Sequence, residues 1–360
     1  MPVVGLVAFA LVSHPQARAS GQTLSPRPAY AAGAALASVP APVPAPDRRR
    51  LLIYYGDLDH CNGARDVEEA GRFLAQWDFL IMEPSLDVAG VIYRHNPDAL
   101  IFYYIDIGNI SRHPSSVIKG LVDRHKSRGA GGIFLDCAGY DFEVSRQRLN
   151  EMLDYVHAQG LYACVNAWHP EDVMENAARP VWNPDALETH MGARDFYLAE
   201  DFLGLDSSPE RVRELPAIKS KSDKLVAYRR RLGVRMLATG TLDFSTRTQA
   251  GADLQFELLE VAASIWAFDG YGLCAPEYSA SGPNHNVARA FIYDPGYPAL
   301  KNVNVSSTLA DSGKTIRRPD CGAAIHDEVT YFWFDRPTSA SRVGADRHET
   351  DVHDTTGNLQ

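Results

Sequence analysis

The sequence predicts an α/β protein, a (β/α)8 TIM barrel with a short C-terminal β extension. Three observations support this fold class: eight short apolar runs rich in Ile, Tyr, Phe and Val, amphipathic segments between most of them, and a span of about 230 residues for the whole alternation. An open doubly wound sheet would show fewer strands and a glycine-rich nucleotide turn after the first one. No GxGxxG motif follows the first strand, and neither GxxxxGKS nor GxxxxGKT occurs in the chain, so a closed barrel is favoured.

Eight strands follow one another between residues 51 and 277. Their predicted ranges are Leu51–Asp57, Phe79–Glu83, Ala99–Gly108, Gly132–Asp136, Leu161–Trp168, Phe196–Glu200, Met236–Asp243 and Gly272–Glu277. The clearest helical runs are Val117–Arg128, Ser145–Gln159, Ser222–Leu232 and Leu254–Phe268. The glycines that we expect to end these helices are Gly129, Gly160, Gly233 and Gly270.

The first residues of the chain have the composition of an export signal. Residues 3–12 form an apolar run of about ten, too short to span a bilayer, and Ala17 and Ala19 precede a cleavage site before Ser20. We therefore expect residues 1–19 to be a signal peptide of a secreted, periplasmic or cell-surface protein. An ordinary flexible tail is the alternative, since no Lys or Arg precedes the apolar run.

The rest of the chain divides into a linker, a barrel, an extension and a tail. Residues 20–48 are rich in Ala and Pro, and residues 339–360 are polar, so we expect both to be disordered. Residues 49–283 hold the barrel, and residues 284–338 are too short for a second core, which predicts a β extension packed on the barrel. Its strand-like pieces are Ala290–Tyr293 and Val329–Phe334. No segment predicts an integral membrane span.

Charge and motifs exclude several kinds of partner. The 45 acidic residues outnumber the 35 basic ones, a formal charge of −10, which argues against a nucleic-acid partner and favours a neutral or cationic ligand. The five cysteines form no CxxC pair and the histidines no HxH or HExxH motif, so we expect neither a metal nor any other cofactor. No GxSxG motif supports a serine hydrolase. The sequence makes no prediction of the oligomeric state.

Acidic residues stand at or near the end of nearly every predicted strand. In barrel enzymes these C-terminal strand ends carry the chemistry. Aromatic side chains accompany the acids, among them Tyr54, Tyr103 and Tyr197, and flat rings stack on sugar faces. The predicted substrate-binding residues are Tyr55, Asp57, Glu83, Tyr104, Asp106, Tyr140, Asn166, Trp168, Asp243 and Glu277. For any single acid the alternative is a structural role as a helix cap or in a turn.

Two of the strand-end acids are the candidate catalytic residues. Asp136 ends the fully apolar run Gly132–Leu135, and Glu200 ends the run Phe196–Ala199. Glu is a poor turn residue whose long side chain suits a general acid, whereas Asp201 beside it is expected to face the other way. Glycoside cleavage needs such a pair, because one acid protonates the leaving oxygen while a second carboxylate meets the oxocarbenium-like centre. The sequence does not assign these two roles.

These segments resemble those of a known enzyme superfamily. The runs Phe102–Gly108 and Gly132–Asp136, and the strand that ends at Glu200, resemble the family 114 glycoside hydrolases, the endo-α-1,4-polygalactosaminidase group, and the related spherulin-4-like barrels. The resemblance implies a secreted or surface (β/α)8 hydrolase that acts without a metal inside an amino-sugar polysaccharide. It also implies that Asp136 and Glu200 are the catalytic acids. Cys137 stands where the spherulin-4-like pattern has a second acid.

The acidic and aromatic strand ends therefore predict a glycoside hydrolase, and the resemblance implies that it is endo-acting. Its substrate is expected to be a polysaccharide, and the acidic mouth favours a cationic amino-sugar polymer. The alternative is a non-catalytic glycan-binding barrel. A third hypothesis is an enzyme of another type, since the barrel fold alone does not specify the reaction.

Overall fold

The computed structural model of the chain describes residues 50–58, 61–83, 87–108, 113–202, 215–241, 256, 259–263 and 265–274, together with four short strands between residues 310 and 334. The predicted signal peptide, the whole predicted linker and the predicted tail lie outside these residues, as do the predicted site residues Asp243 and Glu277. The boundaries of the segments therefore stay predictions. Within the described ranges, no helix is both long and apolar enough to cross a membrane.

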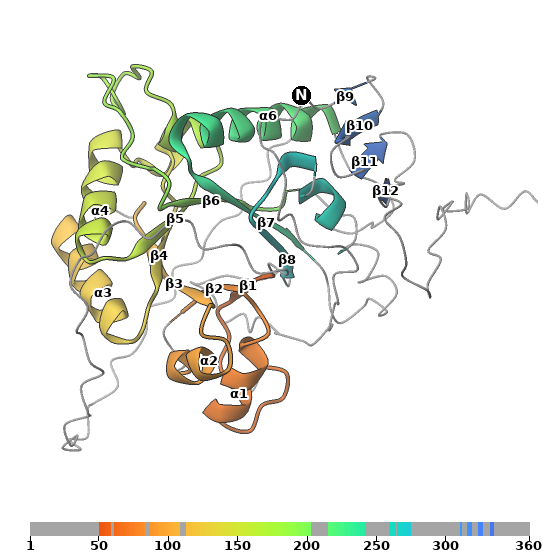
Figure 1. Cartoon of the computed structure of the whole chain (residues 1–360). Helices are drawn as coiled ribbons and strands as arrows, with labels where there is room; N and C mark the ends of the chain where they lie inside the picture. Colours follow the sequence, from red (N-terminus) through yellow and green to blue (C-terminus); the bar gives the residue numbers. More distant parts are fainter. Residues whose placement is uncertain are drawn as a thin grey trace, which may run out of the picture. The chain divides into compact units, whose positions relative to one another are not determined.

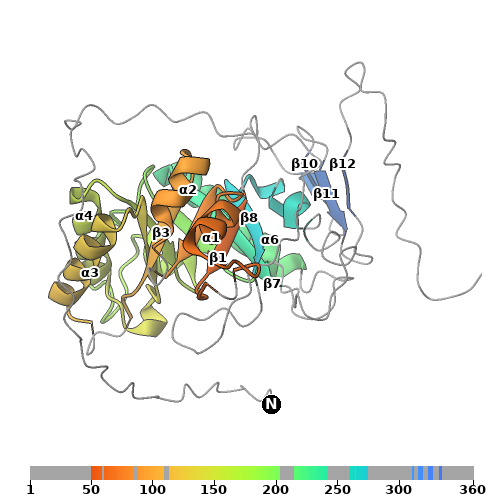
Figure 2. The same ribbon diagram turned by 90° about the horizontal axis from the view of Figure 1, so that it is seen from below.

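Eight parallel strands follow one another in chain order around the barrel (Figures 1 and 2). They are β1 (Leu51–Tyr54), β2 (Phe79–Met82), β3 (Leu100–Asp106), β4 (Gly132–Asp136), β5 (Tyr162–Asn166), β6 (Phe196–Ala199), β7 (Arg235–Thr241) and β8 (Gly270–Cys274). A parallel bridge between Arg50 and Tyr271 joins the first strand to the last, so the sheet is nearly closed. The predicted (β/α)8 barrel is confirmed. Where the following residues are described, most strands stop one to three residues before their predicted ends.

Helices connect the strands in the order that the sequence predicts. They are α1 (Val67–Leu74), α2 (Ala89–His95), α3 (Ser115–Ser127), α4 (Arg146–Ala158), α5 (Pro170–Met174) and α6 (Leu215–Leu232), with a short 3-10 helix η1 (Tyr140–Phe142) after β4. Three of the four clearest predicted helical runs correspond to α3, α4 and α6. The described part of the fourth run is helical at residues 256, 259–263 and 265–266.

Most of the predicted helix ends are confirmed. Ser145 caps α4, since its side chain accepts a hydrogen bond from the Arg148 N–H. The predicted stop glycines have the positive φ that glycine adopts without strain, 92° at Gly129, 78° at Gly160 and 77° at Gly233. The prediction for Gly270 was wrong, because Gly270 begins β8 and Ala267 takes a left-handed conformation before it, with φ 59°.

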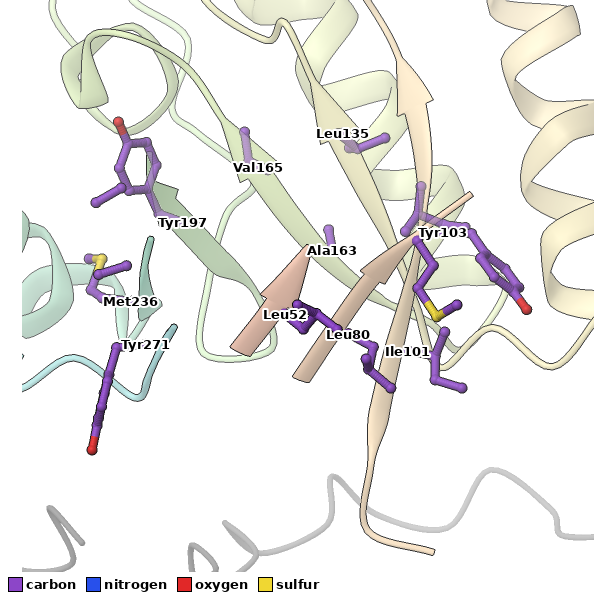
Figure 3. Close-up of a cluster of buried hydrophobic side chains, with 14 of the residues drawn as sticks. Leu52, Leu80, Ile101, Tyr103, Leu135, Ala163, Val165, Tyr197, Met236 and Tyr271 are labelled. Atoms are coloured by element: carbon purple, nitrogen blue, oxygen red, sulfur yellow. The ribbon is translucent and has the colours of Figure 1, made fainter. Parts of the chain in front are cut away.

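Alternate residues of each strand face the barrel interior and the surrounding helices. The interior is filled by Leu51, Ile53, Phe79, Ile81, Phe102, Phe134, Cys164, Phe196, Leu198, Leu237 and Cys274. Figure 3 shows the outer layer, in which Tyr103 and Tyr197 are buried, and Tyr54 belongs to the same layer. The expectation that these three tyrosines contribute to the barrel mouth was therefore wrong. The hydroxyls of Tyr54 and Tyr197 instead donate to the carbonyls of Asp57 and Ala167, just beyond the strand ends.

The connection from β5 to β6 departs from the regular pattern. Helix α5 has only five residues, and residues 175–195, which we call the strap, return beside α4. Three contacts follow α4 from its start to its end: Arg146 N–H to the Trp182 carbonyl (2.9 Å), Asn150 Nδ2 to the Glu188 carbonyl (2.7 Å) and His157 Nε2 with Asp195 Oδ1 (2.7 Å). Helices of a barrel begin at the mouth side, so Trp182 lies on that side.

A second, antiparallel sheet is present in the region of the predicted β extension. Its strands are β9 (Ala310–Asp311), β10 (Thr315–Arg318), β11 (Ala323–His326) and β12 (Phe332–Phe334), in the order β12-β11-β10-β9. The predicted piece Val329–Phe334 overlaps β12, whereas Ala290–Tyr293 lies outside the described residues. Packing of this sheet on the barrel stays a prediction.

Candidate active site

Every second residue of a strand faces the barrel interior, and the same alternation continues past the strand ends to the C-terminal mouth of the barrel. The predicted site residues that fall in the interior-facing positions are Tyr55, Glu83, Tyr104, Asp106, Asp136, Asn166 and Glu200. Tyr55 and Tyr104 pack against the interior cluster, and their rings meet edge to face with centroids 5.4 Å apart. The structure thus brings most of the predicted residues to one end of the barrel.

Asp136 is the last residue of β4 and the centre of an electrostatic cluster. Burial raises the pKa of its carboxyl group to about 7, and repulsion from Glu200 and from Asp106 adds to the rise. Two hydrogen bonds act in the opposite direction, since the Cys137 main-chain N–H and the Tyr104 hydroxyl both donate to the carboxylate. Near neutral pH, Asp136 therefore holds its proton part of the time.

Glu200 directly follows β6 and carries the charge that acts most strongly on Asp136. The chain turns sharply at the next residue, Asp201, whose φ is 43°. Burial lowers the pKa of Lys221 on α6, and attraction by nearby acids, Glu200 first among them, opposes this change. Glu200 therefore interacts with both a carboxyl group and an ammonium group.

The strands on either side of β4 each end at a polar side chain. Asp106 ends β3, where its Oδ1 accepts a hydrogen bond from the Gly108 N–H at 2.8 Å. Asn166 ends β5, is buried, and donates through Nδ2 to the Leu198 carbonyl at 3.4 Å. Main-chain groups thus orient both side chains at the level of Asp136.

The other predicted site residues differ in exposure. Burial raises the pKa of Glu83. Asp57 is exposed, and the Trp168 side chain after β5 is 60% exposed. Tyr140 lies in η1, where its main-chain N–H donates to Asp172 Oδ2 at 3.1 Å.

Trp182 is a residue that sequence reasoning missed. Its ring stacks on that of Tyr140, with centroids 6.3 Å apart and planes 13° apart. Trp182 stands in the strap, far from any strand end, so no rule based on strand ends selects it. The pattern Pro180-Val181-Trp182, apolar residues in an otherwise polar loop, is the sequence signal that points to it.

The site is made of carboxyl, hydroxyl, amide and aromatic groups. Over the part of the chain that the structure describes, no group of three or more His, Cys, Asp or Glu residues is placed to hold a metal ion. Two interacting carboxyl groups, one of them with a pKa raised to about 7, can exchange a proton with a bound substrate. The arrangement is therefore suited to acid–base chemistry.

The chain has structural neighbours of low similarity among solved structures. No protein-family model and no curated protein sequence matches the chain. Among solved structures, the chain is similar to the glycoside hydrolase domain of PelA from Pseudomonas aeruginosa, with a TM-score of 0.40 and 14% identity over 63% of this chain and 94% of that one. It is also similar to the carboxyl transferase domain from Rhizobium etli pyruvate carboxylase with pyruvate and biocytin, with a TM-score of 0.37 and 14% identity over 63% of this chain and 40% of that one. Neither likeness bears on the chemistry of the site or on membership of a family.

Proposed function

We propose that the protein is a glycoside hydrolase that uses Asp136 and Glu200 as its two carboxyl groups. The observation that carries this proposal is the electrostatic interaction between them, which helps burial to raise the pKa of Asp136 to about 7. Glycoside cleavage needs one carboxyl group that keeps its proton near neutral pH and a second one that is ionised. The rings of Tyr55 and Tyr104 lie at the same end of the barrel and offer apolar surface to a sugar.

In this mechanism Asp136 donates the proton to the leaving glycosidic oxygen. Glu200 then acts as the carboxylate that stabilises the oxocarbenium-like centre, either as a nucleophile or as the base that activates water. Carboxyl groups about 5 Å apart retain the anomeric configuration, whereas a separation of about 6.5 to 9.5 Å leaves room for water and inverts it. Nuclear magnetic resonance of the first product formed would decide between the two.

The substrate that we propose is a polysaccharide rich in free amino sugars. Asp106, Asp136 and Glu200 place three acidic groups at one end of the barrel, and Glu83 also lies in an interior-facing position. A cationic glycan neutralises such a site, and its binding weakens as salt screens the charges. Binding of partly deacetylated polymers that does not change with salt would contradict this part of the proposal.

A panel of polysaccharides tests the activity itself. Wild type, Asp136→Asn and Glu200→Gln are incubated with cationic, neutral and acidic polysaccharides, and the reducing ends released are counted. We expect release from a cationic polymer by wild type and a loss of at least about a hundredfold in each variant. Asp98→Asn, an exposed residue ahead of β3 at the opposite end of the barrel, is the matched control and should keep full activity.

The roles of the two carboxyl groups are separated by the leaving group. Asp136→Asn should keep activity on aryl glycosides whose leaving group needs no proton, because only proton donation is lost. If Glu200 is the nucleophile, Glu200→Ala should regain turnover with azide, which enters the space left by the carboxylate and attacks the sugar in its place. The reverse pattern would exchange the two assignments. Binding of glycans without any release of reducing ends would favour the glycan-binding alternative.

We also propose that the protein acts outside the cytoplasm, as the apolar run and Ala17-Arg18-Ala19 suggest. Expression of the full chain and of a chain that starts at Ser20, followed by fractionation, tests this. The full chain should be found outside the cytoplasm with a new N-terminus at Ser20, and the shortened chain should stay inside.

A further inference from the structure

The Tyr140–Trp182 ring pair lies on the mouth side of the barrel, in the connections that follow β4 and β5. Tyr140 belongs to η1, four residues after Asp136, and Trp182 belongs to the strap. The N–H of Arg146, the first residue of α4, donates to the Trp182 carbonyl at 2.9 Å, which fixes this part of the strap at the mouth side of the helix. Both rings are partly exposed, so apolar ring surface is accessible there.

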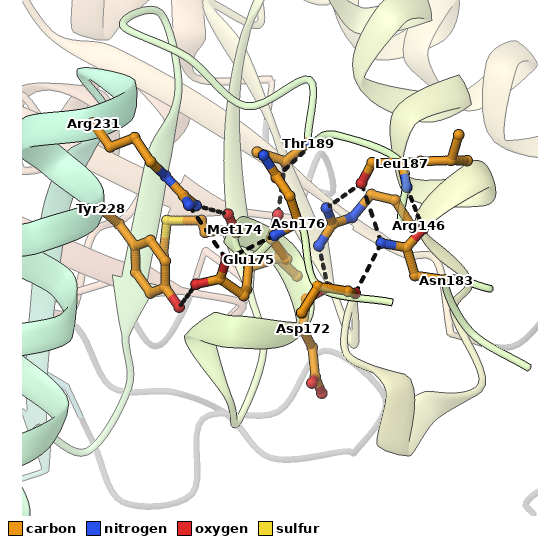
Figure 4. A network of polar contacts seen from close by, with 12 residues as sticks. Arg146, Asp172, Met174, Glu175, Asn176, Asn183, Leu187, Thr189, Tyr228 and Arg231 are labelled. Carbon is orange, nitrogen blue, oxygen red and sulfur yellow. Dashed lines mark hydrogen bonds and ion pairs between the residues drawn. The ribbon is translucent and has the colours of Figure 1, made fainter. Parts of the chain in front are cut away.

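A buried polar network holds this part of the strap in place (Figure 4). Arg146 is fully buried, and its guanidinium donates to the Asp172 carbonyl at 2.8 Å and to the Leu187 carbonyl at 3.3 Å. The side chain of Asn183, the residue after Trp182, accepts a hydrogen bond from the Leu187 N–H through Oδ1 (2.8 Å). Its Nδ2 donates to the Leu187 carbonyl (3.1 Å). A buried arginine is costly without hydrogen-bond partners, so the two carbonyl contacts of Arg146 favour this position of the strap.

The backbone next to Trp182 has a conformation that its residue type disfavours. Val181 has φ 71° and is 76% exposed, although β-branched residues rarely occupy the left-handed region. An exposed valine gains no burial from this conformation. Such outliers are kept where the surrounding structure imposes them, often at binding sites.

Two carboxylates lie close to the main chain at Gly139 and Tyr140, where η1 begins. A Cβ atom at Gly139 would lie 2.2 Å from Asp141 Oδ1 and 3.4 Å from Asp172 Oδ2, so both carboxylates approach the same glycine. Asp172 Oδ2 accepts from the Tyr140 N–H, and a carboxylate oxygen has capacity for more than one hydrogen bond. A flat aromatic surface beside hydrogen-bond acceptors matches the apolar face and the hydroxyl groups of a sugar ring.

We infer that the Tyr140–Trp182 pair forms a sugar-binding subsite for a residue of the polysaccharide that is not adjacent to the cleaved bond. This inference rests on the proposed function. The sugar ring stacks on the exposed surface of the aromatic pair while Asp141 and Asp172 accept hydrogen bonds from its hydroxyl or amino groups. The competing view is that Trp182 only packs the strap against η1, and this predicts an effect on stability rather than on substrate length.

Chain-length dependence separates these two views. Binding of glucosamine and galactosamine oligomers, from the disaccharide upward, is measured calorimetrically in an Asp136→Asn background, with and without Trp182→Ala. We expect Trp182→Ala to weaken binding of the longer oligomers by about three- to tenfold and to leave that of the shortest ones unchanged. Trp182→Phe should keep most of the affinity. Tyr155→Ala, which removes a partly exposed ring on the outer helix α4, should have no effect.

Two results would overturn the inference. If Trp182→Ala and its parent bind every oligomer with equal affinity, the ring pair is not a sugar-binding subsite. The proposed hydrolase then still stands, provided that wild type releases reducing ends. Equal weakening at all lengths, with a lower melting temperature, assigns Trp182 a structural role. Length-dependent weakening without any release of reducing ends by wild type would retain the subsite and reject the hydrolase.

Discussion

Asp106 and Asp136 are register partners at the ends of the neighbouring strands β3 and β4. The ladder continues beyond them, since the Ile107 N–H donates to the Asp136 carbonyl at 3.1 Å. Parallel pairing therefore places two carboxyl groups at the same level of the barrel mouth, and the charge of Asp106 adds to the raised pKa of Asp136. The proton-holding property of Asp136 thus depends on its neighbours as well as on its burial.

Opposite shifts of the pH profile should follow from changes at two neighbours of Asp136. If protonated Asp136 is the acid, kcat/KM falls as the pH rises through its pKa of about 7. Asp106→Asn removes a repelling charge, which lowers this pKa and moves the falling limb to lower pH. Tyr104→Phe removes a hydrogen bond to the carboxylate, which raises the pKa and moves the limb to higher pH.

Steady-state kinetics between pH 5 and 9 measure the falling limb of kcat/KM in both variants, because this pH range brackets the Asp136 pKa of about 7. Asp98→Asn again serves as the control, because an exposed acid at the opposite end of the barrel should not move the profile. Shifts in the same direction for both variants would contradict the electrostatic account.

Much of the barrel could be predicted because its signals are local. Each strand is a run of apolar residues that ends at a polar one, so the sequence identifies all eight strands and the order in which Asp106, Asp136 and Glu200 reach the mouth. The predicted ends overran because Tyr55, Glu83 and similar residues continue the alternation after strand pairing has stopped.

What the sequence could not reveal depends on contacts between distant segments. Tyr103 and Tyr197 point toward the helices because they occupy the outward-facing positions of the alternation along β3 and β6. The aromatic content of a strand does not by itself show which positions face outward. Trp182 stacks on Tyr140, which lies 42 positions earlier in the chain, and the buried Arg146 holds the strap that contains Trp182. Neither local propensity nor motif spacing predicts such a contact.

Acid should destabilise the fold through His125. This histidine of α3 is 4% exposed, and burial lowers its pKa to about 4, partly offset by a hydrogen bond to the main chain of Tyr104. The unfolded chain binds the proton at pH about 6.5, so stability falls as the pH drops from about 6.5 to about 4, by up to about 3 kcal/mol. Urea unfolding at several pH values measures this loss.

His125→Gln keeps a donor for the Tyr104 carbonyl and does not titrate. Between pH about 6.5 and about 4, we expect the free energy of unfolding of His125→Gln to fall less steeply than that of wild type. This holds even if the variant is less stable at pH 7. His95→Gln, at an exposed histidine of α2, should retain the wild-type pH dependence. An unchanged slope in His125→Gln would reject the assignment.

Arg146 should be essential for the conformation of the strap. Arg146→Ala leaves the Leu187 and Asp172 carbonyls without their donor and opens a cavity, so we expect a loss of roughly 2–5 kcal/mol in the free energy of unfolding. The strap should then be cleaved faster by proteases in the native state. Arg94→Ala, which removes an exposed ion pair with Glu68, should change stability by less than about 1 kcal/mol. Equal stability of the two variants would contradict this view.

Closure of the barrel should depend on the absence of a side chain at Gly272. A Cβ atom there would lie 1.8 Å from the carbonyl oxygen of Leu51, a main-chain atom of β1 that cannot move without shifting the strand. Gly272→Ala should therefore destabilise the fold by at least about 3 kcal/mol. Gly120→Ala is the matched control, because the glycine lies inside α3 with open space around its Cβ position. That change should stabilise the protein by about 0.5–1 kcal/mol, since alanine favours the helix. Urea unfolding of both variants measures the difference, and a Gly272→Ala protein as stable as wild type would show that β8 and β1 can separate without cost.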